Sequence, residues 1–103
     1  MEMLKMNDKI KNLHLDDLYR AILSLKTPDE VSAFFDDICT IKELKSMSQR
    51  LQVAQLLDAG EQYSKIVCET GASTATISRV NRCLRYGSDG YRLVLDRIAE
   101  KED

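Results

Sequence analysis

The stretch GASTATISRVNRCLRYG, residues 71–87, decides how this chain folds. It opens and closes with glycine, starts with small hydroxyl residues, and contains three arginines but no carboxylate. Ile77, Val80 and Leu84 recur at spacings of three and four residues, which predicts a helix with one apolar face. Ser73 is placed to cap the start of this helix, and the final glycine is placed to end it.

A shorter helix is expected immediately before this stretch. Residues 62–70, QYSKIVCET, span only two turns before Gly71, which accepts the positive φ that a tight turn needs. A short helix, a turn with glycine and a longer helix form the plan of the helix-turn-helix motif. Ile66 is expected to pack against the apolar face of the longer helix, so that another face of that helix points outward.

The outward face of the second helix carries side chains that suit the major groove of DNA. Thr74, Ala75 and Ser78 lie near its start, which is the part that meets base edges in this motif. Serine and threonine hydroxyls exchange hydrogen bonds with bases, and alanine and threonine methyl groups contact the thymine methyl. Basic side chains further from the turn are expected to reach phosphates. The predicted DNA-binding residues are Lys65, Ser73, Thr74, Ala75, Ser78, Arg82 and Arg85.

Helical patterns continue on both sides of the motif, and no stretch alternates with the period of a strand. The boxes TPDE and TIKE, which start at Thr27 and Thr40, are typical of helix N-termini. We expect helices over residues 15–25, from 28, from 41 to about 59, over 62–70, from 74 to about 86, and from 88 or 89. The sequence therefore predicts an all-α fold of six helices in a single domain, residues 1–103, with residues 1–11 as a flexible arm.

Most of these helices carry an apolar stripe, including the first two, and the stripes of the third and last helices predict how the domain packs. The long third helix is expected to be central, and its stripe consists of Ile41, Leu44, Met47, Leu51, Ala54 and Leu57. The last helix places Tyr91, Val94, Leu95 and Ile98 on one face. A chain of 103 residues with this much apolar helix surface is expected to bury part of it against a second copy.

Composition and charge bound the class of protein. The formal net charge is -2, yet residues 1–40 hold eight acids and five bases, whereas residues 70–88 hold three arginines and no acid. Because local basic surface attracts phosphate, the acidic total does not exclude DNA as a partner. No apolar run approaches the roughly 20 residues of a membrane span, and the first residues lack the apolar centre of a signal peptide. We expect a cytoplasmic protein that binds no membrane.

The cysteines and the histidine do not form a catalytic or metal-binding pattern. Cys39, Cys68 and Cys83 are odd in number and have no CxxC spacing, so they are interpreted as small packing residues. The lone histidine, His14, has no HExxH partner, and no phosphate-binding loop occurs. Neighbouring carboxylates such as Asp16 and Asp17 point in different directions on a helix. We expect neither an enzyme nor a bound metal or cofactor.

The segments RLQVAQLLDAGE (50–61) and GASTATISRVNRCL (71–84) resemble the Trp repressor family. The stretch STATISRVNRCLRYGSDGY is most similar to the YerC/YecD branch of that family, whose members are repressor-like proteins. The resemblance implies a six-helix chain that interlocks with a second copy. Such a homodimer presents two recognition helices to a two-fold DNA site.

The resemblance also implies a pocket for tryptophan, the corepressor of the family's best-known member. Position by position, the implied pocket residues are Thr40, Arg50, Thr76, Arg79, Val80 and Cys83. Arg79 would bind the amino-acid carboxylate. The family has glycine where this chain has Val80, and serine where it has Cys83. We therefore predict that tryptophan binds poorly, and the sequence leaves open whether another small molecule acts as effector.

These observations favour a sequence-specific DNA-binding transcriptional regulator, expected to act as a repressor, which reads a two-fold operator as a homodimer. The alternative is a dimeric helical protein-interaction module without a specific DNA site. The chemistry of the second helix of the motif favours the first hypothesis.

Overall fold

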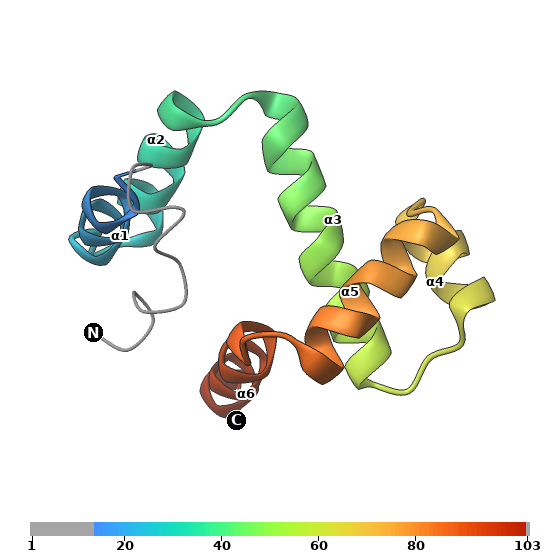
Figure 1. Cartoon of the computed structure of the whole chain (residues 1–103). Helices are drawn as coiled ribbons and strands as arrows, with labels where there is room; N and C mark the ends of the chain where they lie inside the picture. The colour runs from blue at the N-terminus through green and yellow to red at the C-terminus, as the bar shows by residue number, and fades with distance from the viewer. Residues whose placement is uncertain (1–13, 103) are drawn as a thin grey trace. The chain divides into compact units, whose positions relative to one another are not determined.

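A computed structural model describes residues 14–102 of the chain (Figure 1). Six α-helices follow one another, and no strand occurs within these residues. The helices are α1 (Leu15–Leu23), α2 (Pro28–Ile38), α3 (Ile41–Asp58), α4 (Tyr63–Thr70), α5 (Thr74–Tyr86) and α6 (Gly90–Glu102). The predicted all-α fold of six helices is confirmed, whereas the predicted arm of residues 1–11 lies outside the described residues.

The chain divides into two compact units, Met1–Thr40 and Ile41–Asp103. In the first unit, Thr27 caps α2, because its hydroxyl accepts a hydrogen bond from the backbone N–H of Glu30 at 3.1 Å. The Glu30 carboxylate reaches back to the N–H of Lys26 at 2.8 Å rather than to that of Thr27. Pro28 occupies the first turn, where its missing N–H costs nothing. The start of α2 is thus determined by local sequence, as predicted.

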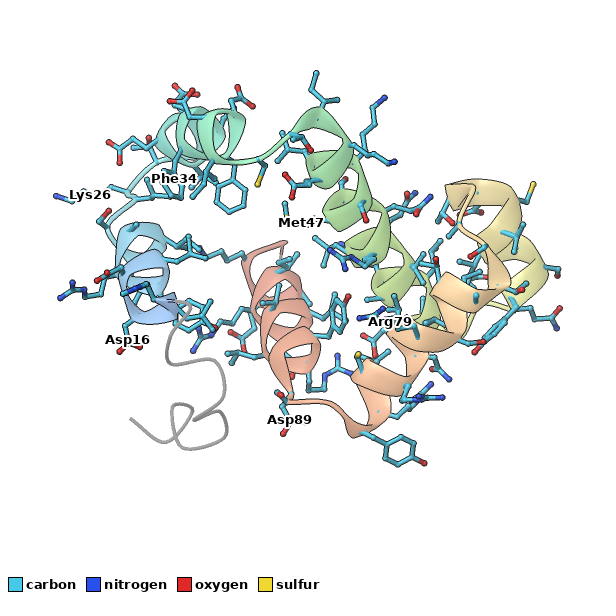
Figure 2. The ribbon with its side chains drawn as sticks, turned by 45° about the horizontal axis from the view of Figure 1, so that its top comes forward. Asp16, Lys26, Phe34, Met47, Arg79 and Asp89 are labelled. Carbon is cyan, nitrogen blue, oxygen red and sulfur yellow. The ribbon has the colours of Figure 1, made fainter. Side chains whose placement is uncertain are left out.

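The helices of the first unit keep their apolar faces accessible to solvent. No residue of α1 or α2 is buried, although both helices have a distinct apolar side. The rings of Phe34 and Phe35 meet edge to face, with 5.9 Å between their centroids, and both side chains are half-buried (Figure 2 labels Phe34). Large apolar side chains that remain exposed here are Tyr19, Ile22, Leu23, Val31 and Ile38. Two helices alone are too small to bury these faces.

The second unit is built around the C-terminal half of α3. This helix packs against α4, α5 and α6, which confirms that it is central to the unit. The core cluster consists of Val53, Ala54, Leu57, Ile66, Ala72, Ile77, Val80, Leu84 and Leu95. Partly buried side chains of Leu51, Leu56 and Tyr91 pack against this core. No polar or charged residue is buried among residues 14–101, so the core is purely apolar.

The predicted apolar stripe of α3 is buried only towards its C-terminus. Ala54 and Leu57 belong to the core, but Ile41 at the other end is 73% exposed. In α6, Leu95 is buried, Tyr91 and Ile98 are half-buried, and Val94 is exposed. Apolar surface therefore remains at the start of α3 and along α6 in a single chain.

None of the helices within the described residues is both long and apolar enough to cross a membrane. Asp89 lies in the short turn between α5 and α6, labelled in Figure 2, and has a positive φ of 65°. Its carbonyl accepts the N–H of Leu93 at 3.0 Å, which starts the last helix.

Candidate nucleic-acid interface

The turn between α4 and α5 is held by Thr70, Gly71 and Ala72. Gly71 adopts a φ of 72° and donates its N–H to the carbonyl of Val67 at 2.9 Å, as expected of a helix C-cap. The Thr70 hydroxyl donates to the carbonyl of Ile66 at 2.7 Å and accepts the N–H of Ala72 at 3.1 Å. The Ala72 methyl group enters the core, so the turn is anchored by both hydrogen bonds and packing.

Local interactions at Ser73 and Gly87 determine where α5 begins and ends. The Ser73 hydroxyl accepts the N–H of Thr76 at 3.1 Å and thereby satisfies one of the free amides of the first turn. At the other end, a Cβ added at Gly87 would collide with the carbonyl oxygen of Cys83. The predicted helix from residue 74 to about 86 is confirmed.

The inner face of α5 locks the motif onto the core. Ile77 is fully buried, Val80 and Leu84 are buried beside it, and Ile66 of α4 is fully buried against the same cluster. Helical spacing predicted Ile77, Val80 and Leu84, and Ile66 was predicted as their packing partner on the shorter helix. Because this face is fixed, the opposite face of α5 must point to solvent.

The outer face of α5 gathers most of the predicted DNA-binding residues. Thr74, Ser78 and Arg82 are exposed and follow one another at intervals of four residues, which places them on one side of the helix. Ala75 is exposed beside them in the first turn. Small polar side chains at the start and a guanidinium two turns later form a surface that a major groove can accommodate.

Three further predicted residues already have partners within the chain. The ammonium of Lys65 lies 3.3 Å from a carboxylate oxygen of Glu61 and 3.8 Å from one of Glu69, so its charge is balanced locally. Arg85 donates through Nε to Asn81 at 3.3 Å. The hydroxyl of Ser73 serves the helix cap described above. These residues stay predicted DNA contacts, but each would have to share or exchange an internal partner.

Two arginines of α5 have no charged or hydrogen-bonding partner among the described residues. Arg79 and Arg82 are exposed and have no ion pair or side-chain hydrogen bond within the described residues (Figure 2 labels Arg79). The helix has no carboxylate of its own. Free guanidinium groups without nearby acids attract phosphate more strongly than paired ones do.

The residues of the implied tryptophan pocket have mixed positions. Arg50 and Thr76 are half-buried, while Arg79 and Cys83 are exposed. Val80 is only 2% exposed and belongs to the hydrophobic core, so its side chain is committed to packing. Thr40 belongs to the first unit, and the other residues belong to the second.

The cysteines differ from the sequence interpretation. Cys68 and Cys83 are exposed, so their interpretation as packing residues is wrong within a single chain, whereas Cys39 is half-buried. All three have free thiols. His14 precedes α1 with a positive φ of 54° and makes no side-chain cap. Among the described residues, no group of histidine, cysteine and acidic side chains has the arrangement to hold a metal ion.

Sequence reasoning missed two features near the motif. Ala72 is a core residue inside the turn, and a small apolar residue directly after the turn glycine was the available signal. A polar pocket also forms on α3 beside Thr70, and its residues are typical of an ordinary solvated helix face. Only the folded arrangement brings them together.

The fold and the exposed face of α5 define a helix-turn-helix protein, the class in which the second helix of the motif reads DNA. A family model described as Trp repressor protein matches residues 13–99. The chain therefore belongs to the Trp repressor family, a family of DNA-binding transcription regulators. The resemblance proposed from the sequence is confirmed.

Known relatives are similar along nearly the whole chain. The uncharacterized protein YerC of Bacillus subtilis (strain 168) is 57% identical over 95 residues, which cover 92% of this chain and 91% of YerC. The crystal structure of a TrpR like protein from Eubacterium eligens ATCC 27750 matches with a TM-score of 0.85 and 53% identity, over 90% of this chain and 96% of the other. A crystal structure from Staphylococcus aureus matches with a TM-score of 0.82 and 50% identity, over 88% and 94% of the two chains.

Proposed function

We propose that this protein is a homodimeric transcriptional repressor that reads a two-fold DNA site through α5. The single observation that carries the proposal is the outer face of α5, where Thr74, Ser78 and Arg82 are exposed on one side of a helix that has no acid. Hydroxyl groups near the helix start can read base edges, and the guanidinium further along can contact phosphate. The protein would act in the cytoplasm, where such a regulator reaches its DNA.

The proposed homodimer is supported by apolar surface that one chain leaves uncovered. Tyr19 and Ile22 on α1, Val31 on α2, and Leu93 and Val94 on α6 are all exposed. Soluble monomers rarely keep this much apolar surface in contact with water. Dimeric readers of this kind match half-sites about one helical turn apart.

Repression without tryptophan is the second part of the proposal. Val80 fills space in the core with a branched side chain at the position where the family has glycine. An indole ring would have to compete with this packing, and displacing a buried side chain is unfavourable. We therefore expect no saturable heat in calorimetry with millimolar L-tryptophan, and saturable heat would contradict this part of the proposal.

The test of DNA binding compares the protein with the double variant in which Arg79 and Arg82 are both replaced by Gln. Fluorescence anisotropy of a labelled duplex reports affinity, and light scattering on the same samples reports the oligomeric state. The proposal expects the variant to stay dimeric and to lose DNA affinity. A wild-type dimer that binds no duplex would instead favour the protein-interaction module.

A further inference from the structure

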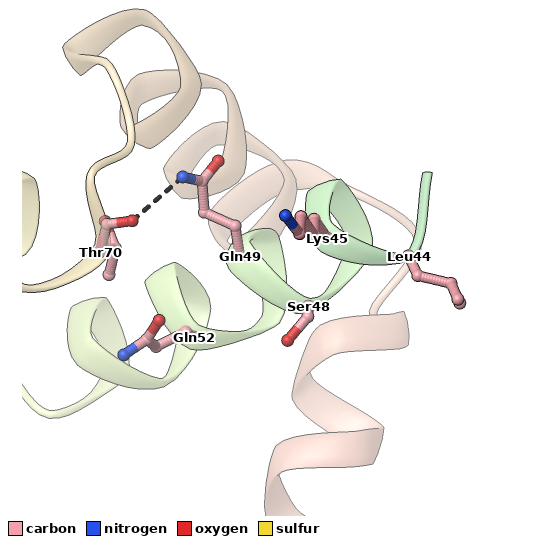
Figure 3. A pocket seen from close by; sticks show the side chains of 6 residues that line it. All are labelled: Leu44, Lys45, Ser48, Gln49, Gln52 and Thr70. Atoms are coloured by element: carbon pink, nitrogen blue, oxygen red, sulfur yellow. Dashed lines mark hydrogen bonds between the residues drawn. The ribbon is translucent and has the colours of Figure 1, made fainter. Parts of the chain in front are cut away.

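A polar pocket lies on α3 beside the end of α4 (Figure 3). It is a shallow depression of about 490 Å³ that is broadly open to solvent. The lining side chains are Leu44, Lys45, Ser48, Gln49, Gln52 and Thr70. The first five share one face of α3, and Thr70, the last residue of α4, lines one edge of the depression. None of these residues belongs to the predicted DNA contacts or to the implied tryptophan pocket.

The lining is rich in hydrogen-bond donors and holds no carboxylate. The ammonium of Lys45 forms no ion pair within the part of the chain that the structure describes, in contrast to Lys65 between its two glutamates. The Ser48 hydroxyl and the Gln52 amide also have no partner among the described residues. An ammonium, a hydroxyl and an amide that line one depression offer donors to the oxygens of an anion.

We propose that this pocket binds a small oxyanion, a molecule whose carboxylate or phosphate group is held by Lys45 and Ser48. Five of the six lining side chains carry a polar group, and Leu44 is the one purely apolar contributor. Such a lining offers several polar groups to a compact, charged ligand. The site shares no residue with the tryptophan pocket that the family resemblance implies.

The pocket is joined directly to the turn of the helix-turn-helix motif. Gln49 donates through Nε2 to the carbonyl of Thr70 at 3.1 Å, as the dashed line in Figure 3 shows. Thr70 in turn bonds the carbonyl of Ile66 and the N–H of Ala72. An anion that occupies the pocket reorders the Gln49 amide, and this contact carries the change to the turn from which α5 begins. We expect the ligand to adjust the position of α5 relative to α3.

Binding of the anion does not depend on the proposed DNA function, whereas its regulatory effect does. The binding test is therefore made without DNA, by NMR titration of the full-length ¹⁵N-labelled protein. The probes are inorganic phosphate and citrate, and the ionic strength is held constant with sodium chloride. We expect saturable amide shifts over residues 44–52 and 70–73.

Two substitutions decide whether the pocket causes these shifts. Lys45→Gln removes the lining ammonium and is expected to weaken binding roughly tenfold or more, as loss of a charge-assisted hydrogen bond does. Lys42→Gln is the matched control, because Lys42 is an exposed lysine one turn earlier that does not line the pocket. Gln49→Leu is expected to leave shifts around residue 45 in place while abolishing those at residues 71–73.

Three results would overturn the proposal. The first is a set of shifts that follows sodium chloride as well as the probes, which indicates general screening. The second is equal weakening by Lys42→Gln and Lys45→Gln. The third is saturation by duplex DNA with no response to either probe, which would assign this surface to the DNA backbone. A protein that binds the probes but no DNA would retain the anion site and refute only the proposed DNA function.

Discussion

Arg92 of α6 donates two parallel hydrogen bonds to the carboxylate of Asp58, the last residue of α3. Its two terminal guanidinium nitrogens lie 2.7 and 2.9 Å from the two carboxylate oxygens. Arg92 also binds Asp96 one turn later on its own helix. This bidentate pair ties α6 to the helix that carries the core, at a point where both side chains are partly exposed.

The pair predicts a pH dependence of stability. The hydrogen bonds from Arg92 hold the pKa of Asp58 below its ordinary value, against partial burial that raises it, and the charges of Arg92 and Arg85 add to the lowering. A carboxyl group with a lowered folded-state pKa stabilises the fold above its unfolded pKa of about 3.8. That stabilisation is lost as the pH falls below this value through the lowered pKa.

We therefore expect Asp58→Asn to unfold at lower urea concentration than the wild type at pH 7, and the difference to shrink below pH 3.8. Urea titrations at several pH values measure it. Asp36→Asn serves as control, because Asp36 is an exposed residue of α2 without a described partner. A gap between wild type and Asp58→Asn that stayed constant down to low pH would contradict the assignment.

Two substitutions of Ser73, the residue that caps α5, are expected to separate effects on folding from effects on DNA binding. Ser73→Ala removes the acceptor for the Thr76 N–H and is expected to cost about 1 kcal/mol of unfolding free energy. Ser73→Asp keeps a good cap but adds a negative charge at the face proposed to meet DNA. It should retain stability and lose duplex affinity, as measured by denaturation and anisotropy. Equal DNA affinity for Ser73→Asp and wild type would place this helix start away from the DNA.

Arg82 and Lys65 are expected to differ in how they contribute to phosphate contacts. A residue that neutralises one phosphate adds about 0.9 to the slope of log affinity against log salt. Arg82→Gln should reduce the slope by about this amount per recognition helix. Lys65→Gln should change it less, because Glu61 and Glu69 already balance that charge. Anisotropy titrations over a salt series compare the two, and a larger effect of Lys65→Gln would reverse this interpretation.

The inner face of α5 predicts a large loss of stability on truncation. Ile77 is fully buried, so Ile77→Ala should cost about 2–5 kcal/mol, enough to unfold much of a small domain. Ser78→Ala, one residue along on the exposed face, should change stability little while affecting DNA binding. Chemical denaturation of both variants tests the assignment of the two faces, and similar losses of stability would contradict it.

Sequence patterns were sufficient for the motif because its determinants are local. Spacing identified Ile77, Val80 and Leu84 as the inner face of α5, with Ile66 of α4 as their packing partner, and a serine at the helix start identified the cap. These features depend on helix geometry and on turn chemistry, both of which a single sequence carries.

The remaining features depend on contacts between segments that are distant in the sequence. Ile41 fits the apolar stripe of α3 yet is largely exposed. The spacing of apolar residues predicts that a helix has an apolar face, but it does not say which segment packs against that face. Lys45, Ser48 and Gln52 resemble a solvated face until Thr70 is brought against them by the packing of α4 on α3. The Arg92–Asp58 pair likewise joins residues 34 positions apart.

The most direct test of the central claim is selection of bound sequences from a random duplex DNA pool at near-physiological salt. We expect enrichment of an inverted repeat whose half-sites lie about one helical turn apart. The Ser78→Ala variant is expected to enrich a less defined sequence. Binding without any enriched sequence, or no binding by a dimeric protein, would contradict a sequence-specific reader.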